Sequence, residues 1–204
     1  MVAYNGATLA IIKTQGLLSV SSPSLTLGIT MRQAIVQRII SEYKGKFADW
    51  PSQYGGQYIE KRRSRYWLTE ICHDAERMLS DSGAMNYGVA VYNNFVLKVV
   101  EKGDGAYDLL RRIHAKELRS RHFPKVYTFI VFHNVAFVVM EKLNTCEYAR
   151  RVSTELRTMR FRDVEQSLRK TFKGIRKFHQ RDDCHSGNIM LRQNGTIVLV
   201  DPLA

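Results

Sequence analysis

The residues from Asp183 to Asn188 combine a carboxylate, a histidine at position 185 and an amide, and Asp201 closes a short apolar run further along the chain. In such a set one carboxylate can orient an attacking hydroxyl, while the amide oxygen and the second carboxylate can hold Mg²⁺ over the phosphates of ATP. Mg²⁺ shares its coordination shell with phosphates and water, so one carboxylate and one amide suffice. The spacing predicts phosphoryl-transfer chemistry, and the alternative is a polar turn with a purely structural role.

A lone lysine, Lys98, stands in the middle of the apolar run Phe95–Val100. A lysine in such a strand either extends its ammonium to solvent or pairs with an anion in a cleft. Together with the downstream carboxylates, the position favours contact with a phosphate. The carboxylate expected to partner Lys98 from the following helix is left open between Asp108 and Glu117.

Hydrophobic periodicity predicts the elements that position these residues. Apolar residues at helical spacing predict helices from Thr30 to near Gly45, from about Arg62 to Leu79, around residues 106–113 and across residues 161–178. Strand-like runs joined by polar turns predict two hairpins, within residues 87–100 and 126–140. The fold class is therefore predicted to be α+β, with a small antiparallel sheet, an inserted helix and a helix that leads into the polar loop.

Composition restricts the setting of the protein. The net charge is +12, from 31 basic and 19 acidic residues, which favours anionic partners such as nucleotides, nucleic acid or acidic protein surfaces. The charge does not by itself predict direct nucleic-acid binding, and basic runs are often solvated helix faces. Three cysteines without short spacings favour a reducing cytosol. No apolar run is long enough to cross a bilayer and no secretion leader is present, so a cytoplasmic protein without a membrane partner is expected.

The run Asp183-Cys184-His185-Ser186-Gly187-Asn188-Ile189-Met190, followed by Val200-Asp201-Pro202, resembles the catalytic and metal loops of kinase-like phosphotransferases. The D-x-H-x-x-N form with Asp-Pro is shared with small-molecule kinases of the aminoglycoside phosphotransferase type. With Val-Leu-Lys-Val upstream, the string is most similar to the early serine/threonine protein kinases of lytic podophages, which disable host functions soon after infection. The resemblance covers about residues 68 to 202.

This resemblance implies roles for the chemical residues. Asp183 is expected to act as the base or orienting carboxylate for the substrate hydroxyl, and His185 to hydrogen-bond Asp183 or the transferring phosphate. Asn188 and Asp201 are expected to coordinate Mg²⁺. Lys98 is expected to contact the α- and β-phosphates of ATP.

The resemblance also implies weaker nucleotide-binding sites. Gly83 and Gly88 lie where a phosphate-covering loop is expected, although they lack the G-x-G-x-x-G pattern and a plain helix stop explains them equally well. The segment that contains Glu141 and Leu143 is expected to form a hinge whose backbone hydrogen-bonds adenine, or simply to end a strand.

The implied architecture is a protein-kinase-like two-lobed fold. Residues 1–50 are expected to form a helical or irregular extension, residues 51–143 the N-terminal lobe with its preceding helix, and residues 144–204 a minimal C-terminal lobe. Because the sequence ends soon after Asp201, the platform for a protein substrate is expected to be missing or supplied elsewhere, and the N-terminal helices are expected to pack against the truncated lobe.

Three functions follow from the resemblance. The first is an ATP-dependent Ser/Thr protein kinase of a bacteriophage that phosphorylates host proteins in the bacterial cytoplasm. The second is a kinase-fold pseudoenzyme that inhibits a host factor by binding, and the third is a small-molecule kinase. The basic surface does not separate the first two, since either could engage an acidic host protein or a nucleic-acid-bound complex.

Overall fold

The structure is a computed structural model that describes residues 23–46, 68, 71–79, 88–132, 135–160, 162, 164–177 and 183–203. A five-stranded antiparallel sheet has the strand order β1-β2-β3-β5-β4. Its strands are β1 (Arg77–Leu79), β2 (Val89–Val91), β3 (Phe95–Glu101), β4 (Val126–Phe132) and β5 (Val135–Glu141). A smaller sheet contains β6 (Asn144–Thr145), β7 (Ile189–Leu191) and β8 (Ile197–Leu199), and the 3₁₀ turn η1 (Ser186–Asn188) precedes β7. The helices are α1 (Pro23–Lys46), α4 (Gly105–His114), α5 (Ala149–Thr158) and α6 (Gln166–Arg176).

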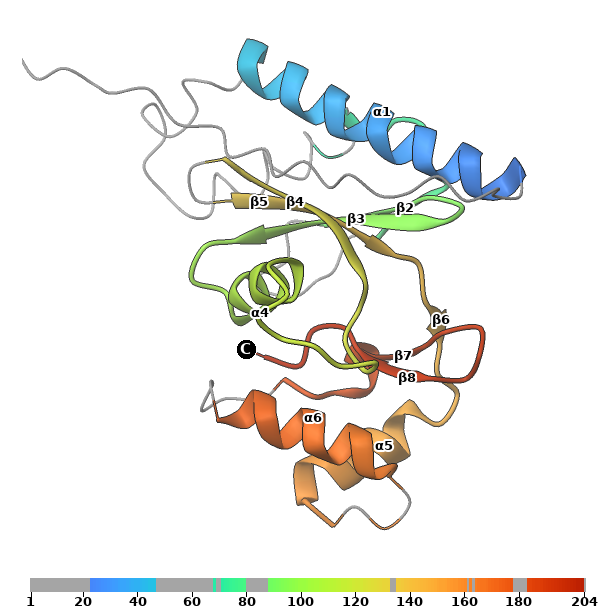
Figure 1. Cartoon of the computed structure of the whole chain (residues 1–204), viewed down its shortest axis with the longest axis vertical. Helices are drawn as coiled ribbons and strands as arrows, with labels where there is room; N and C mark the ends of the chain where they lie inside the picture. The colour runs from blue at the N-terminus through green and yellow to red at the C-terminus, as the bar shows by residue number, and fades with distance from the viewer. Residues whose placement is uncertain are drawn as a thin grey trace, which may run out of the picture.

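These elements form an α+β fold, with the larger sheet toward one end and a small helical lobe, which contains α5 and α6, at the other (Figure 1). Helix α4 lies between the two, and the β7–β8 hairpin lies beside it (Figure 1). The predicted fold class is therefore confirmed. The proposed division at residues 50 and 143 stays a prediction, although β5 ends at Glu141 and the chain then leaves the larger sheet.

Strand β3 explains why Lys98 faces the helical lobe. Leu97 and Val99 belong to the core that includes Ile39 of α1, whereas Val100 belongs to the core that includes Leu110 of α4. Side chains alternate between the two faces of a strand. Lys98 therefore lies on the α4 side of the sheet, although the residues next to it in sequence are fully apolar.

Helix α1 covers the opposite face of the sheet (Figure 1). Its side chains Ile35 and Ile39, one turn apart, are buried in the same core as Phe137 and Val139 of β5. The expectation that the N-terminal helices pack against the C-terminal lobe is wrong for α1, because its apolar stripe is used by the sheet. The helix also begins at Pro23, earlier than the predicted Thr30.

The predicted helix from about Arg62 to Leu79 is also wrong at its C-terminal end. A turn follows Ile71, and Arg77–Leu79 form the edge strand β1, paired with Val89–Val91. Asp74 in this turn accepts two hydrogen bonds from the Arg38 guanidinium, at 2.8 and 3.0 Å, and one from the Tyr92 hydroxyl at 3.2 Å. These tertiary contacts and the open edge of β2 outweigh the helical spacing of the sequence.

Both predicted hairpins are confirmed, as β2–β3 and β4–β5. Helix α4 is also confirmed, with Leu110 directed to the sheet core and Leu109 to the core of the helical lobe. The apolar stripe of the last long helix is confirmed at Leu168, Phe172 and Ile175, which are buried in that lobe. Its outer members, Phe161 and Phe178, lie outside the described residues. Within the part of the chain that the structure describes, no helix is long and apolar enough to span a bilayer.

Candidate phosphoryl-transfer site

The central contact of the site joins strand β3 to the segment after β8. The Lys98 ammonium is 2.5 Å from Oδ2 of Asp201, and only 7% of the lysine side chain and 14% of the aspartate side chain are exposed. A buried charge of this kind is stable only when it is paired. Two of the predicted site residues, which belong to opposite lobes, are therefore brought into direct contact.

Asn188 holds the two loops of the site together. Its side-chain amide donates to the carbonyl of Asp183 at 2.8 Å, to Oδ2 of the same residue at 3.2 Å and to the carbonyl of Asp201 at 2.6 Å. Backbone bonds run in parallel, from the Asp183 N–H to the Pro202 carbonyl and from the Val200 N–H to the Asn188 carbonyl. The predicted base and the predicted metal carboxylate are thus fixed relative to each other through one amide.

His185 lies beside Asp183 at the surface of the same loop. Its Nδ1 accepts the N–H of Gly187 at 3.0 Å, which caps η1, and its Nε2 lies 3.7 Å from Oδ2 of Asp183. Because Nδ1 accepts, this arrangement places the ring proton on Nε2, on the side of the carboxylate. About half of each side chain is exposed, so the pair is open to a substrate hydroxyl from solvent.

The oxygen atoms of the site fit Mg²⁺. Oδ1 of Asp201 is buried and has no hydrogen-bond partner among the described residues. Because the Asn188 amide group uses its N–H donors within the protein, its Oδ1 remains as a second hard oxygen. No group of three or more His, Cys, Asp or Glu side chains within the described residues could hold a metal alone. A site of two protein oxygens is nevertheless sufficient for Mg²⁺ that is also bound by phosphates and water.

Neither helix carboxylate considered for Lys98 contacts it. Asp108 and Glu117 both lie near the guanidinium groups of Arg111 and Arg112 instead. Asp104, the N-cap of α4, lies close enough to Lys98 and Asp201 for their charges to affect the pKa of its carboxyl.

Burial raises the pKa of Asp104 above its ordinary value, and the negative charge of Asp201 adds to this effect. The N–H of Ala106, which donates to Asp104 at 3.0 Å, and the charge of Lys98 both oppose it. The signal for Asp104 in the sequence is its place as an N-cap residue just before an apolar helical repeat.

Of the predicted nucleotide-binding positions Gly83, Gly88 and Leu143, the structure describes the last two. Gly83 lies outside the described residues. Gly88 has a φ of +111°, a conformation that suits glycine, and its carbonyl accepts the N–H of Val99 at 3.3 Å. Leu143 is half-buried in the link between β5 and β6. Contact of these residues with a nucleotide stays a prediction.

Glu141 has a structural role that the sequence did not indicate. Its carboxylate accepts two bonds from Nε of Arg192, at 3.1 and 3.0 Å, one from Nη2 at 2.6 Å and one from the Lys125 N–H at 2.8 Å. Arg192 also donates to the carbonyls of Arg121 and Phe123. The backbone N–H of Glu141 itself donates to the Lys125 carbonyl. The predicted hinge is therefore clamped to the β7–β8 hairpin, and adenine binding by its remaining backbone groups stays a prediction.

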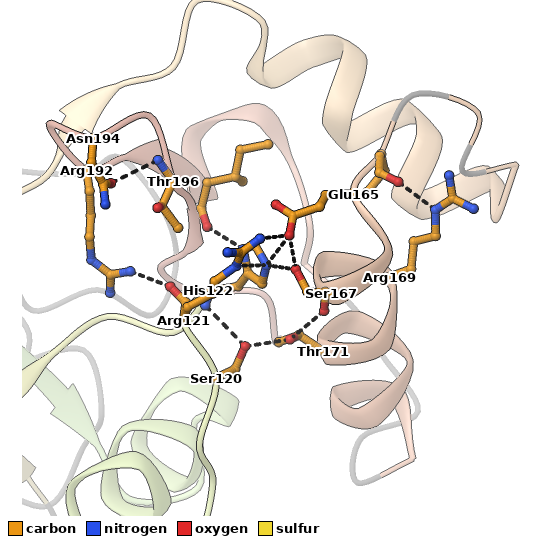
Figure 2. Close-up of polar contacts among 12 residues, drawn as sticks. Ser120, Arg121, His122, Glu165, Ser167, Arg169, Thr171, Arg192, Asn194 and Thr196 are labelled. Carbon is orange, nitrogen blue, oxygen red and sulfur yellow. Dashed lines mark hydrogen bonds and ion pairs between the residues drawn. The ribbon is translucent and has the colours of Figure 1, made fainter.

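A second polar network holds the α4–β4 connection against the helical lobe (Figure 2). The ring of His122, which is 1% exposed, lies 2.8 Å from the Ile197 carbonyl through Nδ1 and 2.6 Å from the Ser167 hydroxyl through Nε2. Burial lowers the pKa of His122, and the charges of Arg121 and Arg192 lower it further, against the bond to Ile197. An isolated histidine has no sequence pattern that predicts this role.

Comparison with known proteins supports the reading of the C-terminal half. Residues 106–204 match the family model described as bacteriophage T7 protein kinase 0.7. The resemblance to phage kinases is therefore confirmed over the part of the chain that carries Asp183, Asn188 and Asp201, while Lys98 lies before the matched residues. No curated protein matches the chain.

Among solved structures, the crystal structure of Rad53 1–466 in complex with AMP-PNP matches at 15% sequence identity and a TM-score of 0.31. The match covers 63% of this chain and 38% of that chain. This likeness is too distant to bear on the residues of the site.

Proposed function

We propose that this protein is an ATP-dependent, Mg²⁺-requiring Ser/Thr protein kinase of a bacteriophage that phosphorylates host proteins in the bacterial cytoplasm. The observation that carries the proposal is the buried contact between Lys98 and Asp201, in which one aspartate oxygen is left without a partner. The match of residues 106–204 to a phage kinase family supports the same activity.

The residues of the site have separable tasks in this reaction. Asp183 orients the substrate hydroxyl and accepts its proton, and His185 lies beside it, with Nε2 3.7 Å from Oδ2 of Asp183. Asn188 and Asp201 would hold Mg²⁺ through their side-chain oxygens. The bound cation would neutralise negative charge on the phosphates. Lys98 supplies a fixed positive charge from the opposite lobe, and its burial keeps that charge poorly screened by water.

A basic groove supports acidic segments of host proteins as the substrates. The groove runs along α5 and the residues that follow it, and its lining contains four arginines and two glutamates, together with Tyr148 and two threonines. The arginines are Arg150, Arg151, Arg160 and Arg162. The inner side of α5 contacts the catalytic loop, since the Ser153 hydroxyl donates to the Cys184 carbonyl at 2.6 Å. Charge complementarity would favour an acidic segment in this groove.

The test is transfer of labelled γ-phosphate from ATP to proteins of a bacterial lysate. The wild-type protein is compared with Asp183→Ala and Asp201→Ala, and with Asp108→Ala as a control that removes an exposed carboxylate of α4. Label in lysate proteins should disappear in the first two variants and persist in the control.

The other outcomes identify the alternatives. Label confined to small metabolites would favour a small-molecule kinase. Toxicity to host cells that persists in both aspartate variants, together with the absence of any transferred label, would favour a pseudoenzyme that acts by docking.

A further inference from the structure

Two backbone segments touch at the first residue of α4. A Cβ atom built on Gly105 would lie 2.7 Å from Cβ of Leu203, 3.1 Å from its carbonyl carbon and 3.3 Å from its carbonyl oxygen. Two of these three atoms are backbone, so the neighbour cannot yield by rotating a side chain. Glycine is therefore required at this position by the close approach of Leu203, and not by an unusual backbone angle.

The segment that meets Gly105 is the one that carries Asp201. Leu203 is 4% exposed and belongs to the core of the helical lobe. The two residues before Leu203 are held by the catalytic loop. The Pro202 carbonyl accepts the Asp183 N–H, and the Asp201 carbonyl accepts the Asn188 side-chain amide. Leu203 is only two positions from Asp201 and is itself fixed in the core, so a displacement of Leu203 would act on Asp201 through Pro202.

Within the described residues, neither Asp108 of α4 nor Glu117, which follows the helix, is paired with Lys98. Both carboxylates are engaged by neighbouring arginines. The first turn of the helix is instead fixed by its cap, since Asp104 accepts the N–H of Ala106 at 3.0 Å. Helix α4 therefore meets the site at the N-terminus of the helix, where Asp104 and Gly105 lie against the segment that contains Asp201.

We propose that Gly105 is a positioning residue for the metal carboxylate. Its missing side chain lets the backbone of Leu203 rest on the first turn of α4, and this contact sets the place of Asp201 relative to Lys98. The inference rests on the proposed function, because the property that it controls is the use of Mg²⁺ with ATP.

The experiment compares Gly105→Ala with Gly174→Ala. Gly174 lies within α6, and a Cβ there would meet nothing within 4 Å, so it is a matched glycine-to-alanine control in a helix. The folded state is checked by circular dichroism. The measured quantity is the Mg²⁺ concentration that gives half of the maximal rise in melting temperature at a fixed ATP concentration, with ATP and a chelator as the metal-free reference.

Gly105→Ala should raise this Mg²⁺ concentration about tenfold, which corresponds to about 1.4 kcal/mol. Overpacking of a tight contact is destabilising, and the metal-bound state needs the undisplaced carboxylate. Gly174→Ala should leave the Mg²⁺ requirement unchanged. In a Leu203→Gly background, which removes the nearest clashing atom, the effect of Gly105→Ala should become smaller.

A variant without added atoms keeps the proposal testable if Gly105→Ala does not fold. Leu203→Gly loosens the contact from the other side and should also raise the Mg²⁺ requirement. Leu168→Ala, a comparable loss of buried surface in α6, should lower stability without that change. An unchanged Mg²⁺ requirement in the folded Gly105→Ala protein, or an equal change in the controls, overturns the inference. A wild-type protein that shows no Mg²⁺-dependent response to ATP instead refutes the proposed function.

Discussion

Replacing Lys98 by methionine tests the ion pair on which the candidate site depends. The substitution keeps an unbranched side chain of similar length and removes only the charge. In the wild-type protein the ammonium is 2.5 Å from Oδ2 of Asp201, while Oδ1 of Asp201 has no partner among the described residues. The variant therefore leaves a buried carboxylate without its counter-charge.

The expected loss of stability is large for a single substitution. Removing one partner of a buried ion pair costs about 3–5 kcal/mol, because the remaining charge is left uncompensated. For a chain of this size each kcal/mol lowers the melting temperature by about 2–4 °C, so a decrease of about 6–20 °C is expected. The pair is buried enough for this estimate, since 7% and 14% of the two side chains are exposed.

The assay is thermal unfolding without nucleotide, with Lys142→Met as the control. Lys142 also forms an ion pair, with Glu76 at 2.9 Å, but 34% and 50% of those side chains are exposed, and such pairs contribute roughly 0–1 kcal/mol. The double variant Lys98→Met/Asp201→Leu, which removes both charges, should recover much of the loss. Millimolar Mg²⁺ should stabilise Lys98→Met more than the wild type, because a cation can then replace the lost ammonium.

Two results would refute this reasoning. One is an equally small change in Lys98→Met and Lys142→Met, which would mean that the Lys98–Asp201 contact is not buried and paired in solution. The other is strict additivity in the double-mutant cycle, because residues in direct contact are expected to show a coupling energy of about 0.5–3 kcal/mol.

Three further predictions concern buried polar contacts. Arg192→Met should lower the unfolding free energy by about 3–5 kcal/mol in urea unfolding, because it leaves the buried carboxylate of Glu141 without its counter-charge. The control Lys170→Met, on the exposed side of α6, should change the unfolding free energy little. Burial lowers the pKa of His122 from its ordinary value of 6.5, so the unfolded chain binds the proton first as the pH falls. The unfolding free energy should therefore decrease below pH 6.5. Unfolding curves at several pH values should show a weaker pH dependence in His122→Gln. Ser153→Ala removes the donor to the buried Cys184 carbonyl and should cost about 1–3 kcal/mol by thermal unfolding; a loss near zero would mean that water replaces the hydroxyl.

The sequence by itself determined the features that depend on local order. The alternation of side chains in Phe95–Glu101 was enough to place Lys98 on the face opposite Leu97 and Val99, and the helical spacing around Leu109 and Leu110 was enough to predict α4. The close spacing of Asp183 and Asn188 brought base and amide together for the same reason. Secondary-structure period and short loops act between neighbours, so their effects are visible in the chain alone.

Only the tertiary structure decided which groups become partners. Lys98 and Asp201 are separated by 103 positions, and Glu141 and Arg192 by 51, so no periodicity links them. The direct pairing of Lys98 with Asp201, the clamp on the predicted hinge and the replacement of a helix end by β1 all depend on buried charge and open sheet edges that exist only after folding. The sequence predicted the chemical groups of the site, and packing between the lobes assembled them.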